Sequence, residues 1–437
     1  MHINWVMAVL LAILPSGFVA ADSEWLQFRG SNGQGISTTL GVPLEWDEET
    51  NVVWKTPIVG EGWSSPVYSG RVAWVTSATE IAASEEQRLE KVAGSPVANA
   101  LELASKISLW VTKIDLDNGR VLQEIKLAEV DDPQCIHSLN SYASPTPALR
   151  DDRLYCHFGD FGTFCLDCST GETVWQRRIQ LDHSVGPGSS PLLYEDLLVL
   201  TCDGMQQQYV TALDAGSGET VWRTDRPPIA AENPEFRKAF STPLAIDVGD
   251  ATQLIVPGAQ WFVAYEPRTG KELWRVDHGR GFSNVPRPVY DGRFVYMCTG
   301  YATSQLWAIA PDGQGDVTDS HVHWRVTKQI PNMPSPVVFG QRIYTVSDGG
   351  IAQCFETSSG DRLWKDRVGG KFSASPLLAG RHLYLCSHDG TTTVISAGDT
   401  YREVARNQLD GQLMASPVVV GDDLLLRTGT HLYRIGD

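Results

Sequence analysis

Two closely spaced cysteines have the spacing of a reactive or metal-binding pair. Cys165 and Cys168 are separated by two residues, as in redox pairs and zinc sites. The pair lies where a short apolar run meets a Ser-Thr-Gly turn, not at the start of a helix that would lower a thiol pKa. Because no second cysteine pair completes a metal site, the sequence favours structural thiols.

Two further pairs of side chains have a spacing that bears on chemistry. If residues 159–162 form a hairpin turn, Cys156 faces Cys165 across neighbouring strands, within reach of a disulfide. His321 and His323 share one face of a strand, but no third ligand is near, which favours an exposed pair at an outer edge. We find no Gly-x-Ser-x-Gly elbow, phosphate loop or His-Glu-x-x-His helix. The sequence therefore points to no catalytic residue and no metal ligand.

A set of large apolar side chains recurs just ahead of a repeated Ser or Pro phrase. Its members are Trp63, Tyr142, Phe240, Phe282, Met333, Phe372 and Met414. Their positions in the repeats place them around the mouth of a central channel, where predicted hairpins add Gln260 and Tyr301. Two interpretations are open: a ring of ligand-binding side chains, or packing that plugs the channel mouth. The predicted ligand-binding residues are Trp63, Tyr142, Phe240, Gln260, Phe282, Tyr301 and Phe372.

Eight repeats must position these side chains. Each begins with a Ser/Thr-Pro or Pro-x-Pro phrase and runs into short apolar strands, and most end in an acidic turn with Gly and Trp, as in residues 167–175 and 214–222. From Pro147 onward the spacing stays near the ~40–50 residues of a four-stranded propeller blade. The sequence therefore predicts an all-β fold, an eight-bladed β-propeller of four-stranded antiparallel blades. The repeat openings include Pro66, Pro147, Pro191, Pro243, Pro288, Pro336, Pro376 and Pro417.

The two ends of the chain predict how the ring closes. After Pro417 only two more strands are found, so the eighth blade lacks its outer strand. Residues Asn51 to Lys55 are predicted to form a strand that belongs to none of the repeats. Pairing this N-terminal strand with the last blade closes the ring and leaves no exposed edge between the first and last blades.

An insertion from about residue 77 to 108 interrupts the first repeat. Residues 84–87, Ser-Glu-Glu-Gln, have the form of a capping box, and Ser95-Pro96 that of a second helix start. Leu101, Leu103, Ala104 and Ile107 are predicted to form the apolar face of that second helix. The sequence therefore predicts a short helical insertion in blade one, on the same side as the channel mouth. A lid, a partner-docking hairpin and a neutral decoration are all open.

Composition and the N-terminus indicate an exported protein. Residues 1–21 have an apolar run and small residues ahead of Asp22, typical of a signal peptide, which leaves residues 22–437 for the propeller. The net charge of −17 disfavours nucleic acid and anionic membrane surfaces as partners. No later stretch is apolar enough for stable membrane insertion. We expect a periplasmic or extracellular location.

The closing phrase, Asp-x-x-Ser/Thr-Gly-Glu-x-x-Trp, resembles the tryptophan-docking motif of the pyrroloquinoline-quinone (PQQ) repeat propellers. These include quinoprotein alcohol dehydrogenases and the non-enzymatic propellers of outer-membrane assembly. Residues 25–33, Trp-Leu-Gln-Phe-Arg-Gly-Ser-Asn-Gly, are similar to the opening of a secreted planctomycete-type subgroup. In the dehydrogenases Ca²⁺ polarises the quinone and a vicinal cysteine disulfide lies over it. No two cysteines are adjacent here, so the resemblance carries over no catalytic residue.

Three functions follow as hypotheses. The first is an exported non-catalytic propeller, without a cofactor, that binds a protein partner or small ligand at the channel mouth. The alternative is a PQQ- and Ca²⁺-dependent quinoprotein oxidoreductase acting on an alcohol or sugar. The third is a structural subunit of an envelope assembly, whose co-purifying proteins would be lost on excision of residues 77–108.

Overall fold

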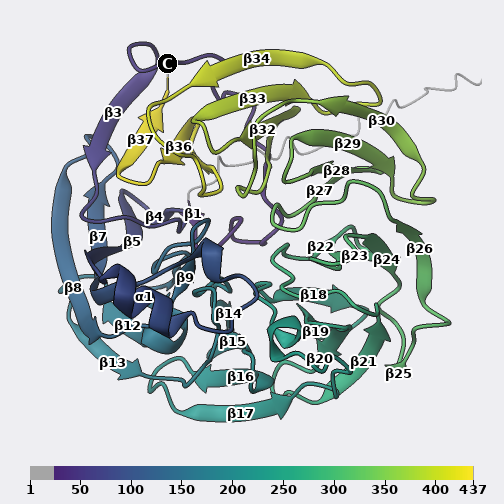
Figure 1. Ribbon diagram of the computed structural model, residues 1–437. Coiled ribbons are helices and arrows are strands. Elements are labelled where there is room, and N and C mark those ends of the chain that lie inside the picture. Colours follow the sequence, from purple (N-terminus) through teal and green to yellow (C-terminus); the bar gives the residue numbers. More distant parts are fainter. Residues whose placement is uncertain (1–23, 437) are drawn as a thin grey trace, which may run out of the picture.

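The computed structural model describes residues 24–436. Figure 1 shows small sheets arranged in chain order around one axis, and eight of them form the blades of a closed propeller. The fold predicted from the repeats is therefore confirmed. The predicted signal peptide, residues 1–21, lies outside the described residues.

The first four blades follow one antiparallel pattern, and blades one and four each carry an extra strand. Blade one contains β1 (Glu24–Trp25), β4 (Val67–Ser69), β5 (Val72–Ala82), β7 (Ala104–Asp115) and β8 (Val121–Asp131). Blade two contains β10 (Ala148–Arg150), β11 (Arg153–His157), β12 (Thr163–Asp167) and β13 (Thr173–Arg177). Blade three contains β14 (Leu192–Tyr194), β15 (Leu197–Asp203), β16 (Gln208–Asp214) and β17 (Thr220–Asp225). Blade four contains β18 (Leu244–Val248), β19 (Ala251–Pro257), β20 (Trp261–Tyr265), β21 (Glu272–Asp277) and β25 (Gly315–Asp316).

The last four blades complete the circle. Blade five contains β22 (Val289–Tyr290), β23 (Val295–Cys298), β24 (Leu306–Ile309) and β26 (Val322–Val326). Blade six contains β27 (Val337–Phe339), β28 (Arg342–Val346), β29 (Ile351–Glu356) and β30 (Arg362–Arg367). Blade seven contains β2 (Ile36–Ser37), β31 (Leu377–Ala379), β32 (His382–Cys386), β33 (Thr391–Ser396) and β34 (Glu403–Gln408). Blade eight contains β3 (Val52–Pro57), β35 (Val418–Val420), β36 (Asp423–Arg427) and β37 (His431–Ile435).

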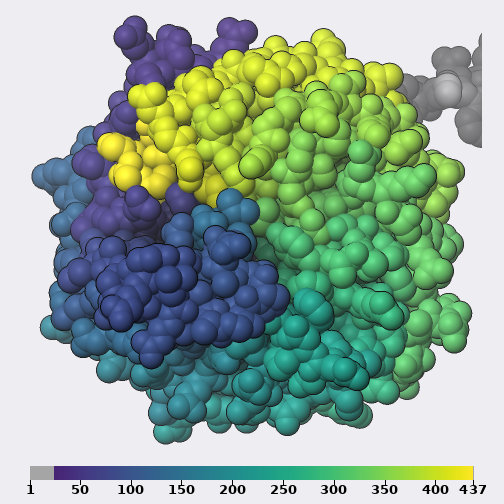
Figure 2. Space-filling model, viewed as in Figure 1, coloured from purple at the N-terminus to yellow at the C-terminus, as the bar shows by residue number. Residues whose placement is uncertain are grey.

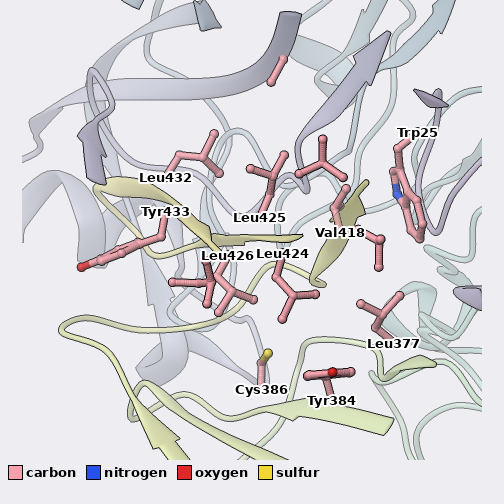
Figure 3. Close-up of a cluster of buried hydrophobic side chains, with 14 of the residues drawn as sticks. Trp25, Leu377, Tyr384, Cys386, Val418, Leu424, Leu425, Leu426, Leu432 and Tyr433 are labelled. Carbon is pink, nitrogen blue, oxygen red and sulfur yellow. The ribbon is translucent and has the colours of Figure 1, made fainter. Parts of the chain in front are cut away.

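The N-terminal strand closes the ring, as the sequence predicts. β3 pairs antiparallel with β37 and is the outer strand of blade eight, beside the C-terminus in Figure 1. Figure 3 shows the packing at this junction, where Trp25 from the N-terminal segment lies in the same cluster as Val418 and Leu425 of blade eight and Leu377 of blade seven. Burial of this shared cluster joins the first and last blades through apolar contact as well as strand pairing.

A docked tryptophan joins several neighbouring blades. The indole nitrogen of Trp54 donates to the Leu116 carbonyl at 2.8 Å, in the turn between β7 and β8. A Cβ on Gly119 in that turn would lie 2.7 Å from the Trp54 ring, so the ring requires a glycine there. The same arrangement recurs in later blades, which explains the spacing of Gly and Trp in the closing phrase. The other indole-to-carbonyl pairs are Trp175 to Ala215, Trp222 to Pro267, Trp324 to Thr357 and Trp364 to Gly398, all at 2.9 Å.

The insertion in blade one contains one α-helix, not two. α1 (Glu85–Lys91) starts at the predicted capping box, with Ser84 and Gln87 exchanging side-chain and backbone hydrogen bonds. The second predicted helix is wrong, because residues 101–107 are mostly strand: β6 (Leu101–Glu102) pairs with β9 (Ile136–His137), and β7 begins at Ala104. The apolar residues there pack against strands instead of forming a helical face. Short 3₁₀ turns occur at Ala98–Ala100, Gly159–Phe161 and Pro234–Arg237.

The possible pairing of Cys156 with Cys165 does not form. Cys165 lies opposite Tyr155, and Cys156 lies opposite Phe164. This one-residue offset sends the two thiols to opposite faces of the blade, where they join different apolar clusters. All eight cysteines are free in the part of the chain that the structure describes. None of the helices in residues 24–436 is long and apolar enough to cross a membrane.

Candidate binding site at the channel mouth

The loops leading into the innermost strands surround a cavity of about 340 Å³ on the propeller axis. We call this side of the disc the mouth face. Figure 2 shows the dark-blue insertion covering part of the mouth face, with a hollow beside it near the centre. Every blade opening contributes at least one lining residue, so the cavity is a product of the whole ring. From the openings these are Trp63, Ser144, Thr146, Gly188, Ser190, Phe240, Thr242, Phe282, Ser283, Val285, Met333, Ser335, Ser373, Ser375, Met414 and Ser416.

A belt of hydroxyl groups forms the cavity wall below its mouth. The backbone N–H of Ser65 donates to the hydroxyl of Thr146 at 2.9 Å, and that of Thr146 donates to Ser190 at 2.9 Å. The same step recurs between most neighbouring blades, and the Ser65 hydroxyl joins the first blade to the last by donating to the Ser416 carbonyl at 2.9 Å. These bonds explain why a Ser or Thr precedes the proline of nearly every repeat. The remaining steps are Ser190 to Thr242, Arg287 to Ser335, Ser335 to Ser375 and Ser375 to Ser416.

Arg287 occupies the belt position of blade five, where its side chain holds the floor of the cavity. Its guanidinium donates to the carbonyls of Pro243, at 3.0 Å, and Phe28. Phe28 lines the cavity, and its segment crosses the axis from β1 on blade one to β2 on blade seven. Burial lowers the pKa of Arg287 to about 9, which leaves it cationic at neutral pH. The opening segment, residues 25–33, thus supplies Phe28 to the cavity floor.

The structure brings four of the seven predicted ligand-binding residues together at the cavity. Trp63, Phe240, Phe282 and Tyr301 line it, as do Met333 and Met414 from the same predicted ring. Their role in binding remains a prediction.

The other three lie elsewhere. Tyr142 is fully buried, and its hydroxyl accepts from the Ala104 N–H at 3.1 Å. Phe372 is buried in the core between blades six and seven. Gln260 donates to Asp277 at 3.2 Å and does not line the cavity.

One corner of the cavity is polar, and no sequence pattern predicts it. The Lys238 ammonium lies 2.5 Å from a Glu235 carboxylate oxygen and donates to Ser184 at 3.1 Å. Burial lowers the pKa of Lys238, and the Glu235 contact opposes that shift. His137, from β9, also lines this corner, and burial lowers its pKa too. These residues sit in the connections between blades, where no repeat position marks them.

The remaining chemical candidates do not form a reaction centre. Burial raises the pKa of Cys165 to about 11 and that of Cys168 to about 12, so both thiols are poor nucleophiles. His323 is exposed on β26, and its ring nitrogen lies 3.1 Å from the Ser358 carbonyl, consistent with the outer-edge interpretation. No group of three His, Cys, Asp or Glu side chains within residues 24–436 is arranged to hold a metal ion.

The donor set of the cavity does not suit PQQ with its Ca²⁺. PQQ carries three carboxylates, whereas the one lysine in the lining, Lys238, is already ion-paired with Glu235. Ca²⁺ takes about six to eight oxygen ligands, and the lining offers one carboxylate, Glu235, and one side-chain amide, Asn140. Both Asn140 and Glu235 are already engaged by neighbouring side chains. The lining is instead mostly aromatic, aliphatic and hydroxyl-bearing.

A protein-family model covers most of the chain. The model for the family described as outer membrane protein assembly factor BamB matches residues 108–257, 206–333 and 258–434. The chain belongs to this family. Among curated BamB-family relatives, BamB of Burkholderia pseudomallei (strain K96243) is 24% identical over 318 residues, 65% of this chain and 81% of the relative. BamB of Legionella pneumophila (strain Paris) is 24% identical over 270 residues, and the match spans 59% of this chain but only 52% of that relative.

Solved structures share the fold of this BamB-family chain. BamB from Moraxella catarrhalis matches with a TM-score of 0.53 at 15% identity, covering 77% of this chain and 94% of that one. Quinohemoprotein alcohol dehydrogenase from Comamonas testosteroni matches with a TM-score of 0.64 at 11% identity, covering 94% of this chain and 80% of that one. At these identities the likeness shows the fold alone, because one propeller architecture supports both enzymes and non-enzymes.

Proposed function

We propose that this chain is an exported, non-catalytic β-propeller that binds a protein partner on its mouth face, with apolar side chains of the partner seated in the central cavity. The observation that carries the proposal is the lining of that cavity: a ring of aromatic and methionine side chains with one internally paired Lys–Glu corner. Its volume of about 340 Å³ also falls within the ~300–1,000 Å³ range of ligand pockets.

The family and the N-terminus support the compartment and the kind of partner. Relatives of this chain carry the name outer membrane protein assembly factor, which names proteins that act in the assembly of outer membrane proteins. The signal peptide predicted for residues 1–21 agrees with export to the periplasm or beyond. We therefore favour a protein partner over a small ligand, and a mature chain that begins at Asp22.

Site-specific photocross-linking in the producing cells tests the proposal. A cross-linking side chain at Phe282, on the cavity wall, is expected to capture a discrete protein adduct. The matched control is Val221, half-exposed on the outer strand β17. A second variant, Tyr301→Glu, should abolish the adduct from position 282, because a charge at the cavity rim opposes burial of an apolar side chain. Equal adducts from positions 282 and 221 would overturn the proposal.

The oxidoreductase alternative has its own test. Addition of PQQ and Ca²⁺ to the purified chain should leave the absorbance spectrum and dye reduction with alcohols or sugars unchanged. Saturable PQQ binding that is lost in Phe282→Glu would replace the proposed function with the quinoprotein one.

A further inference from the structure

Three half-exposed apolar side chains, Phe236, Tyr301 and Leu139, extend the apolar surface of the cavity to its rim. The ring centroids of Phe236 and Phe282 lie 4.7 Å apart, and those of Phe282 and Tyr301 lie 6.3 Å apart. Phe236 is 43% exposed and Tyr301 is 37% exposed, so both rings present apolar surface to solvent on either side of Phe282. Leu139, at 41% exposure, lines the cavity on the side of the insertion. A partner that fills the cavity would cover these side chains at the same time.

Three carboxylates gather beside this apolar surface. Glu61 lies two residues ahead of Trp63 and pairs through its backbone with Ala78, on the strand that carries Glu80. Glu102 lies on β6, which pairs with β9, and its charge opposes the lowering by burial of the pKa of His137, the β9 residue that lines the cavity. None of the three forms an ion pair with any residue from 24 to 436. They are therefore a local excess of negative charge at the edge of the cavity.

The ionisation of Glu80 reflects this crowding of carboxylates. Burial, together with the charges of Glu61 and Glu102, raises the pKa of Glu80 to about 7. The lysine of the cavity lining, Lys238, is held by Glu235 and Ser184 and does not pair with these carboxylates. A cation supplied from outside would lower the free energy of all three carboxylates while the apolar surface is covered.

From this arrangement we propose that the mouth face binds a segment of a protein partner in which a bulky apolar side chain is flanked by lysine or arginine. The apolar side chain enters the cavity between Phe240 and Phe282, and the cation lies over Glu61, Glu80 and Glu102. This inference rests on the proposed function and specifies the chemistry of the partner. The acidic net charge of the chain, −17, favours approach of such a segment from a distance.

Two synthetic peptides test the inference on the purified mature chain. The probes are acetyl-Lys-Leu-Phe-Leu-Lys-amide and its counterpart with glutamate in place of both lysines, with binding measured by isothermal titration calorimetry at low salt. We expect the lysine peptide to bind at least about tenfold more tightly, and the difference to shrink as salt is raised. No measurable binding of the lysine peptide at about 1 mM, or equal affinity for both peptides, would overturn the inference.

Variants separate the two parts of the site. The double variant Glu80→Gln with Glu102→Gln should reduce the preference for the lysine peptide by roughly three- to tenfold. Glu219→Gln, an exposed glutamate in the turn before β17, is the matched control and should leave the preference unchanged. An unchanged preference in the double variant also overturns the inference.

Phe282→Ala should weaken binding of both peptides. If it weakens both while the preference for lysine is absent, the cavity is a binding site and only the cation requirement fails. If it weakens neither, the proposed function itself fails. Circular dichroism of each variant verifies that the propeller remains folded.

Discussion

Removing the indole of Trp54 tests whether the N-terminal strand seals the propeller. Trp54 lies on β3, is only 8% exposed, and docks on the turn of blade one across the junction between the first and last blades. In Trp54→Ala, β3 can still pair with β37, but the contact with Gly119 and Leu116 is lost. The substitution therefore weakens the seal without deleting the strand.

The expected cost follows from the contacts that disappear. Replacing a buried tryptophan with alanine typically costs about 3–5 kcal/mol, because transfer free energy and a cavity term add. The Leu116 carbonyl keeps a second donor, the Arg434 guanidinium at 2.6 Å, so it is not left without a hydrogen bond. We therefore expect Trp54→Ala to lower the free energy of unfolding by about 3 kcal/mol, the lower end of that range. Trp54→Phe, which keeps an aromatic ring but not the donor, should cost less.

Urea unfolding followed by circular dichroism measures the effect. Trp54→Ala should unfold at a clearly lower urea concentration than the native chain, and Val221→Ala, on an exposed outer-strand site, should not. Deleting residues 24–57 removes β3 together with β1 and β2, and should abolish the cooperative transition. A Trp54→Ala variant that unfolds at the same urea concentration as Val221→Ala would refute the idea that this strand holds the ring closed.

Three further predictions concern buried charge and backbone. Stability should fall as the pH drops from about 6.5 toward 4, because three buried neutral histidines resist protonation that the unfolded chain accepts, which outweighs the opposing contribution of Glu80. A flat urea midpoint between about pH 6.5 and 4.5 would contradict this. Arg226→Met should lower the free energy of unfolding by about 3–5 kcal/mol, because it leaves the buried Asp203 carboxylate without its partner. In a double-mutant cycle, adding Asp203→Leu should restore most of that stability. Gly33→Ala should destabilise more than Gly249→Ala, as judged by thermal melting: both have positive φ, but only the Cβ at position 33 would meet the Arg287 guanidinium, at 2.6 Å. The histidines, with their lowered pKa values, are His157 (about 4), His183 (about 3) and His278 (about 4).

The repeated phrases determined the number of blades and the way the ring closes. Each phrase encodes a small sheet that cannot bury its apolar faces alone, so eight phrases imply eight packed neighbours. The Gly and Trp of the closing phrase are local signals of a contact that recurs between blades, so their spacing in the sequence is enough to reveal the repeat. Counting strands at the two chain ends then sufficed to place residues 51–55 against the last blade.

Only the tertiary structure distinguishes residues that occupy equivalent positions in the repeats. Tyr142 and Phe282 occupy corresponding positions, yet only Phe282 reaches the cavity, because Tyr142 is buried against the strands of the insertion. Apolar residues 101–107 fit a helical period, but pairing of β6 with β9 and of β7 with β5 draws them into strands. Cys156 and Cys165 lie on opposite faces because the loop between β11 and β12 covers residues 158–162, one residue more than the turn expected at 159–162, which shifts the register by one residue.

The candidate site likewise combines residues that the repeats predict with residues that only long-range packing brings together. The sequence alone located the channel mouth and four aromatic residues of the cavity wall, because those residues recur at one position of each repeat or in its hairpin. The floor at Phe28, the Lys238–Glu235 corner and the carboxylates near Trp63 come from segments outside the repeats. Their meeting depends on long-range packing across the ring, and a repeat pattern carries information only about neighbouring blades.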